Sequence, residues 1–153
     1  MNIQAQFRAE VRSQLEPLTA SLIPVLQQLI LHPYPPEMVS LEFEVFCERF
    51  TTGFPVRAFF MDAERNECCI GRLPADPDLL TIEQVYSPSV EEKYTELDET
   101  LDLWTAASEV LIGWFSDCWM AAGGARFPLQ AHIGLHDEIH VFDLIRQEWK
   151  IFY

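Results

Sequence analysis

Residues 39–47 read VSLEFEVFC, and this stretch decides the fold. From Leu41 to Cys47 every second residue is apolar and two of the residues between are glutamates. An alternation with a period of two predicts a β-strand with one face against a core. Residues 1–36 instead place apolar side chains at steps of three or four, from Ile3 to Leu29, which is typical of helix. We therefore expect the chain to change from helix to sheet near Val39.

The helical segment before this strand contains Pro17 and Pro24. Each proline removes one helical hydrogen bond, so we expect either a kink or two shorter helices. Three prolines in the sequence HPYPP, residues 32–36, end the segment. Residues 1–36 carry no net charge, so the whole excess of acid lies in residues 37–153.

Further strands are expected after residue 47, in segments bounded by turn residues. They are predicted over residues 54–61, 67–71 and 80–86. A four-residue loop between the first two strands would place Glu48 opposite Arg57, which is a favourable cross-strand pair.

The clearest helix signal follows in residues 89–122. Ser89 and Glu92 form a capping box, and Gly123-Gly124 supplies the end, so one long helix is expected. Its second half is apolar on nearly all sides and must be packed between other elements.

The four tryptophans are candidate interface anchors, although we expect Trp104 in the core. Trp114 and Trp119 cannot both face one sheet, so one should pack on the N-terminal helix.

The last part of the chain returns to a period of two. Residues 130–135 and 139–145 are expected to form a hairpin whose three-residue loop aligns Ile133 with Val141, followed by a short strand over 149–153. The fold class predicted is therefore α+β, a mostly antiparallel sheet of about six strands with an N-terminal helical segment and one long helix. We expect a single domain over 1–153, with a helical segment 1–36 and an acidic body 37–153.

Composition restricts the partners of this chain. It has 153 residues and a net charge of −14, with 24 acidic against 10 basic residues. This sign excludes the usual nucleic-acid binder. No signal peptide or membrane span is recognised, so we expect a cytoplasmic protein that binds no membrane. Four cysteines without a disulfide spacing indicate reduced thiols.

Catalytic and metal-binding patterns are weak. His132, His136 and His140 are spaced by four, but on the predicted hairpin His136 lies in the turn, so they are only weak candidates for metal ligands. Cys68 with a histidine could act as nucleophile and base, and Glu42 with Glu44 could act as general acid and base. No nucleophile elbow, phosphate loop or CxxC pair accompanies them. We therefore expect no catalytic residue, no cofactor and no stoichiometric metal.

An acidic cluster stands out in residues 91–102, where six acids accompany only Lys93 and the net charge is −5. On one helix, Glu92, Glu96 and Glu99 would share a face. The cluster is either a solvated helix face or a docking surface for a basic protein, which such a field would steer. The candidate partner-binding residues are Glu91, Glu92, Glu96, Asp98, Glu99 and Asp102, with Glu42, Glu44 and Glu48 as an extension.

Three functions are compatible with these features. The first is an immunity protein that neutralises a bacterial toxin by direct binding, because such inhibitors are similar in size and acidity. The second is a secretion chaperone. The chain resembles type III secretion chaperones in the order of its elements, which are a first helix, three or more strands, a long helix and a terminal hairpin. This resemblance implies a dimer that holds an effector segment. The third is a small enzyme. The sequence leaves the oligomeric state open, with a homodimer as one alternative.

Overall fold

The computed structural model describes residues 2–47, 53–68, 70–80 and 85–152. Its elements are α1 (Ile3–Leu15), α2 (Thr19–Leu31), β1 (Met38–Val45), β2 (Val56–Asp62), β3 (Asp78–Leu80), α3 (Pro88–Leu97), α4 (Leu103–Ala121), β4 (Gln130–Leu135), β5 (His140–Asp143) and β6 (Glu148–Ile151). Within the described residues the strands form one six-stranded sheet in the order β3-β2-β1-β4-β5-β6. Among these described strands only the β1–β4 pair is parallel. The predicted α+β class is confirmed.

The N-terminal segment is two helices, which is one of the two expected outcomes. The Asn2 side chain caps α1 by accepting a hydrogen bond from the backbone of Ala5 at 2.7 Å. Pro17 lies in a short 3-10 turn, Glu16–Leu18, that joins α1 to α2. Pro24 lies inside α2 without ending it.

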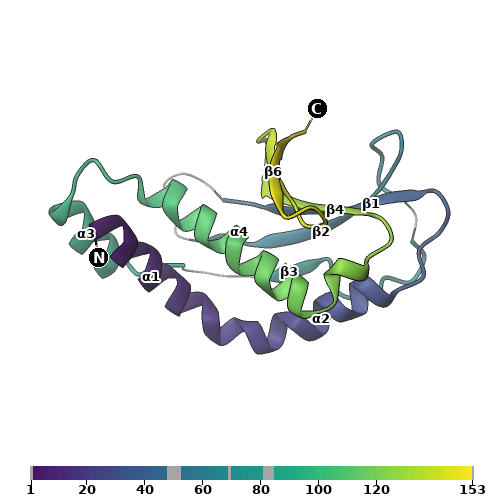
Figure 1. Ribbon diagram of the computed structural model, residues 1–153, viewed down its shortest axis with the longest axis horizontal. Coiled ribbons are helices and arrows are strands. Elements are labelled where there is room, and N and C mark those ends of the chain that lie inside the picture. The colour runs from purple at the N-terminus through teal and green to yellow at the C-terminus, as the bar shows by residue number, and fades with distance from the viewer. Residues whose placement is uncertain (1, 48–52, 69, 81–84, 153) are drawn as a thin grey trace.

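The core lies between the sheet and the helices α1, α2 and α4, which occupy the same side of it (Figure 1). Phe43 on β1 packs against Phe115 and Trp119 on α4, at ring-centroid distances of 4.8 Å and 5.8 Å. Trp114 turns the other way and donates a hydrogen bond from its indole to Thr19 on α2 at 2.9 Å. The apolar half of α4 is therefore packed on both sides, as expected. None of the described helices is long and apolar enough to cross a membrane.

The predicted register of the first two strands is wrong, because Arg57 lies opposite Glu44. Glu48 lies outside the described residues. In the observed register the buried side chains of β2 lie opposite those of β1, for example Ala58 opposite Phe43. A shift of four residues would leave part of the apolar side chains of β2 without partners on β1. Burial of these side chains therefore outweighs the charge pair predicted between Glu48 and Arg57.

The edge of the sheet beside β2 also differs from the prediction. Of the expected strand over 67–71, residue 69 lies outside the described part of the chain, and the described residues form a bridge between Glu67 and Met61. On the side of β2 away from β1, the pairing strand is β3, which begins two residues before the expected strand over 80–86. Of the expected strand over 80–86, residues 81–84 lie outside the described part of the chain. The Arg57–Asp78 ion pair at 2.7 Å stabilises the β2–β3 pairing.

The predicted single helix over 89–122 is wrong, because two helices, α3 and α4, occupy this region. The N-cap of α3 is Ser87 and not Ser89. Asp98 accepts hydrogen bonds from the amide and hydroxyl of Thr100, and Asp102 caps α4 by accepting one from the amide of Thr105 at 3.1 Å. Such local bonds compete with a continuous helix. The predicted end is confirmed, since Gly123 adopts φ 97°, which suits glycine.

The C-terminal hairpin forms with a register one residue away from the prediction. Ile133 lies opposite Phe142, and Gly134 lies opposite Val141. The connection has four residues, 136–139, and Asp137 within it adopts φ 65°. A shift of one residue exchanges the faces of a strand, so His140 and Phe142 point to the helix side. The last short strand, β6, is confirmed, and β5 and β6 stand out from the rest of the sheet (Figure 1).

Candidate protein-binding surface

The acidic residues at 91–102 gather at one end of the molecule, on α3 and the turn that joins it to α4 (Figure 1). Glu91, Glu92 and Glu96 project from α3, and Glu99 lies beyond its C-terminus, so the expected single helix face does not form. All four side chains are exposed. Within the described part of the chain none of these four carboxylates has an ion pair or hydrogen bond. We call these four residues the acidic cluster.

Asp98 and Asp102 have a structural role in the same segment. Hydrogen bonds from the hydroxyl and the amide of Thr100 lower the pKa of Asp98. Asp102 caps α4 through the amide and hydroxyl of Thr105. These two carboxylates thus hold the α3–α4 turn in shape, and the acidic cluster is presented on either side of Asp98.

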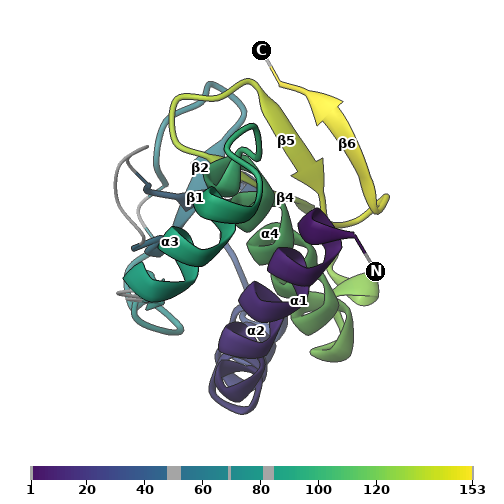
Figure 2. The ribbon, with the colours of Figure 1, turned by 90° about the vertical axis from the view of Figure 1, so that its left-hand side faces the viewer.

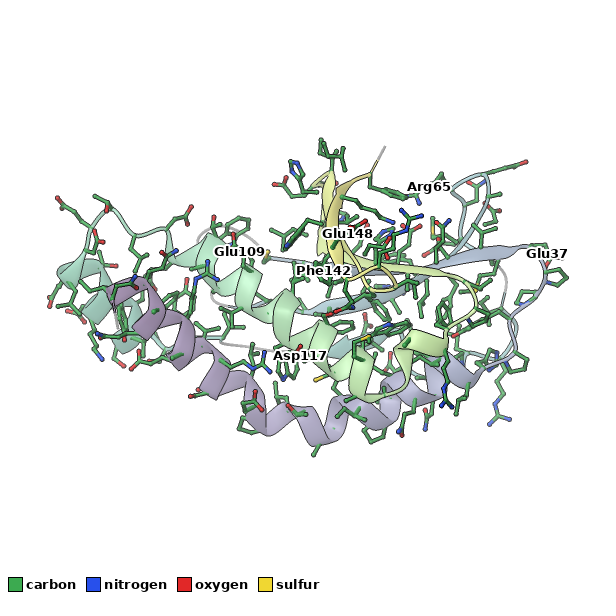
Figure 3. The ribbon with its side chains drawn as sticks, viewed as in Figure 1. Glu37, Arg65, Glu109, Asp117, Phe142 and Glu148 are labelled. Atoms are coloured by element: carbon green, nitrogen blue, oxygen red, sulfur yellow. The ribbon has the colours of Figure 1, made fainter. Side chains whose placement is uncertain are left out.

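Arg8, Arg12 and Lys93 form ion pairs with acids outside the acidic cluster. Arg8 binds Glu109 and Arg12 binds Asp117 at 2.9 Å, which ties α1 to α4 along the positions labelled in Figure 3. Lys93, the only base within 91–102, turns toward Glu10 on α1 at 3.4 Å. The charge of the acidic cluster is therefore left uncompensated by ion pairs within the described residues.

A groove of about 280 Å³ lies between α4 and the β5–β6 hairpin. Apolar and polar side chains from both walls line it, and they include Trp104, Ser108, Ile112, Leu135, His140 and Trp149. Trp149 is 51% exposed, and Ile151 on the same strand is 49% exposed. We call this cavity the hairpin groove.

Acidic side chains also border the hairpin groove. Glu109 and Glu138 contribute to its walls, and α4, which forms one wall, begins directly after the acidic turn at Asp102. The first turn of α4 lines the groove with Trp104 and Thr105, together with His140 and Trp149 of the hairpin (β5 and β6 in Figure 2). Protein interfaces commonly combine an aromatic centre with a charged rim. The hairpin groove and the acidic cluster together have this composition.

Glu42, which we expected on the acidic surface, is instead buried on the other side of the sheet. Only 4% of the residue is exposed, and the same holds for His132 beside it on β4. The Glu42 carboxylate accepts hydrogen bonds from Ser40 at 2.8 Å and from Arg65 at 2.5 Å, and lies 3.3 Å from His132 Nε2. The Arg65 guanidinium lies 4.0 Å from the ring centroid of Phe152, so the C-terminal end closes over this polar cluster.

The charge state of Glu42 decides what it can do. Burial alone would raise its pKa, but the hydrogen bonds and charges of His132, Ser40 and Arg65 outweigh burial and hold the pKa at about 2. A carboxylate with so low a pKa is a poor general acid or base near neutral pH. The cluster instead connects β1, β4, the turn after β2 and the C-terminal end.

Glu44 does not extend the acidic cluster either. Glu44 is half-buried and lies 3.0 Å from His136 Nδ1 in the β4–β5 turn. Figure 3 places Arg65, which contacts Glu42, near the C-terminal strands and far from α3 at the opposite end. Glu48 lies outside the described residues.

The three histidines are separated by the observed register. His132 is buried with Glu42, His136 pairs with Glu44, and His140 lies on the opposite face of the sheet in the hairpin groove. Among the described residues, no group of three or more histidine, cysteine or acidic side chains is arranged to hold a metal ion.

Burial, Asp62 and Glu37 raise the pKa of Cys68, so this thiol is protonated at neutral pH and is a weak nucleophile.

Two residues of the polar cluster, Arg65 and Phe152, had no signal in the sequence. Arg65 comes from the turn after β2, where it adopts φ 69°, and Phe152 comes from the end of the chain. Arg65 reaches Glu42 because β2 pairs with β1, and Phe152 reaches Arg65 because the C-terminal strands join the same sheet through β4. Comparison with known proteins finds no family, no curated protein and no solved structure that matches this chain.

Proposed function

We propose that this chain is a protein-binding protein that docks a basic partner through the acidic cluster and the hairpin groove. The observation that carries the proposal is the combination of four exposed, unpaired carboxylates with a groove in which Trp149 is half-exposed. The most concrete case is an immunity protein that neutralises a bacterial toxin by direct binding. No cofactor, metal, nucleic acid or membrane takes part in the proposed activity.

The physical basis is a division of roles between charge and apolar contact. A net charge of −14 with a local concentration of unpaired carboxylates attracts a basic protein from a distance and orients it. Rim charges act mainly on the rate of association, whereas buried aromatic anchors act on the rate of dissociation. The acidic cluster therefore supports fast capture, and the hairpin groove supports retention.

We expect the triple variant Glu92→Lys, Glu96→Lys and Glu99→Lys to associate with the native partner at least about tenfold more slowly at low salt. Its rate should also depend less on salt, because fewer opposite charges are screened. Stopped-flow association kinetics at several salt concentrations measure both quantities. Glu91 is left unchanged because it lies in the first turn of α3, where its charge stabilises the helix.

A matched control carries the same change in net charge elsewhere. Glu37, Glu64 and Glu67 are exposed residues away from α3, and Glu37 lies at the opposite end of the molecule in Figure 3. The variant with lysine at these three positions should associate faster than the acidic-cluster variant at every salt concentration. Equal rates for the two triple variants would show that total charge, and not the acidic cluster, controls association.

The nature of the captured partner separates the three functions. A basic secreted toxin whose activity is lost on binding supports the immunity protein. An effector held by its disordered N-terminal segment on a dimer of this chain supports the chaperone instead. Turnover of a small molecule with no protein partner supports an enzyme and contradicts the proposal.

We also propose that the protein functions in the cytoplasm with four reduced cysteines. In the described part of the chain, Cys47, Cys68 and Cys118 are free thiols. A thiol titration of the unfolded protein, without added reductant, should therefore find four reactive groups per chain. A count of two or fewer would show disulfides and contradict this compartment.

A further inference from the structure

We propose that the partner adds a β-strand to the free edge of β6, using an extended segment in which apolar and basic residues alternate. Its apolar side chains would enter the hairpin groove, and its basic side chains would face the other side of the sheet. This inference rests on the proposed function and names the way in which the partner is held.

The backbone of β6 offers an open edge to such a segment. β6 is the last strand of the sheet and pairs only with β5 among the described strands. The Phe152 amide donates to the Ile139 carbonyl at 2.7 Å, so alternate residues, Lys150 included, direct their backbone groups toward β5. The amide and carbonyl groups of Trp149 and Ile151 then point outward and have no partner in the described part of the chain.

The side chains along this edge are unusually apolar for a free strand. Trp149 lies opposite Phe142 and Ile151 lies opposite His140, so both project to the face that carries the hairpin groove. Proteins usually protect a free edge with charge, proline or a covering element, because an open edge invites another chain. An edge that instead exposes about half of a tryptophan and half of an isoleucine suits strand addition, in which the backbone supplies affinity and pockets supply specificity.

Charge complementarity identifies the occupant as a basic segment. On the opposite face of β6, Glu148 is exposed and Lys150 is already paired with Asp143 at 3.2 Å. Glu148 has no ion pair among the described residues, so its charge can attract a basic side chain on that face. A second copy of this chain would bring another net charge of −14 to the same edge. Repulsion therefore disfavours self-pairing and favours a segment that carries lysine or arginine.

The probe for this inference is a ten-residue peptide of alternating valine and lysine. Two forms are compared, one with N-methyl groups on three valines and one with N-methyl groups on three lysines. The two forms have the same charge and composition, but each loses the hydrogen bonds of only one edge, since alternate amides in a strand point to opposite edges. Methylation on valine blocks an antiparallel addition, and methylation on lysine blocks a parallel one.

We expect one methylated form to bind the wild-type protein at least tenfold more weakly than the other, as measured by calorimetry. In the complex with the tighter form, hydrogen exchange should slow at the amides of Trp149 and Ile151. Equal affinity of the two forms would overturn strand addition, because it would leave charge as the only source of binding. Failure of the unmethylated peptide to bind would also overturn it.

The protein-side test uses Ile151→Pro with Ile151→Ala as its control. Proline removes the outward amide without breaking a bond to β5, whereas alanine removes the side chain and keeps the amide. Ile151→Pro should weaken peptide binding at least tenfold more than Ile151→Ala, while both variants keep the circular dichroism spectrum of the wild type. Unchanged binding to Ile151→Pro would overturn the inference. A dimer of the protein alone that Ile151→Pro dissociates would also overturn it, since a second copy would then occupy the edge.

This result can be told apart from the test of the proposed function. If charge reversal of the acidic cluster slows capture of the native partner but the two methylated peptides bind equally well, the proposed function stands and strand addition is wrong. If one methylated peptide binds at least tenfold more weakly than the other and charge reversal has no effect, strand addition stands and the acidic cluster is not the capture site.

Discussion

Replacing Trp119 with alanine should lower the free energy of unfolding by about 3–5 kcal/mol, the usual cost of removing a large buried aromatic side chain. Trp119 is completely buried, and its ring meets Phe43 at 5.8 Å and Phe127 at 5.4 Å in edge-to-face arrangements. These contacts join α4 to β1 and to the loop before β4, so the cavity would open at the centre of the core. Urea denaturation monitored by circular dichroism measures the loss.

Gly124 supplies a sharper test of the same packing. A Cβ atom at Gly124 would lie 2.1 Å from Trp119 Nε1, so Gly124→Ala should cost about 1–3 kcal/mol by overpacking. The two substitutions combined should cost less than their sum, because alanine at 119 makes room for the new methyl group. The control is Gly113→Ala on α4, where nothing lies within 4 Å and where alanine should stabilise the helix by about 0.5–1 kcal/mol. Simple additivity would contradict the close approach of Gly124 to Trp119.

The variant Glu42→Gln should lower the free energy of unfolding by about 1.5–3 kcal/mol at pH 7, since it removes the charge that Arg65, Ser40 and His132 stabilise. The control is Glu44→Gln, two residues further along the same face of β1. Glu44 is half-exposed and, in the described part of the chain, pairs only with His136 in the turn, so its loss should cost less than about 1 kcal/mol.

The pH dependence of the Glu42 effect follows from its low pKa. The pKa of this carboxyl is about 2 in the folded protein and near the ordinary 4.5 when unfolded. The stabilisation is therefore fully present above pH 4.5 and is lost as the pH falls toward 2. The difference in stability between wild type and Glu42→Gln should shrink across this range, as measured by urea denaturation at a series of pH values. A difference that stays constant down to pH 2 would contradict the proposed ionised state.

Part of the candidate surface could be recognised from residue order alone. Local charge density identifies the acidic segment, and α3 does present Glu91, Glu92 and Glu96 to solvent. The alternation of acidic and apolar residues around Glu42 also suggested that Glu42 was exposed, which is wrong. A period of two indicates only that a residue faces away from the helices. Whether that face is open depends on Arg65 and Phe152, which arrive from distant parts of the chain.

Local physical chemistry explains what the sequence by itself determined about this protein. The alternation around Leu41 and Phe43 specifies β1, the proline in the N-terminal segment separates two helices, and Gly123 ends α4 in a left-handed conformation. Each of these features depends on interactions within a few residues. The break between α3 and α4 is equally local, since Asp98 and Asp102 carry its hydrogen bonds, and the capping capacity of these residues was the missed signal.

Only the tertiary structure decided how these elements meet. The parallel pairing of β1 with β4 joins strands about ninety residues apart and brings Glu42 beside His132. The one-residue shift of β4 against β5 sends His140 to the hairpin groove, away from the other two histidines. Register and strand order depend on which apolar faces the helices cover together, and this is a property of the whole packed core that no single segment contains.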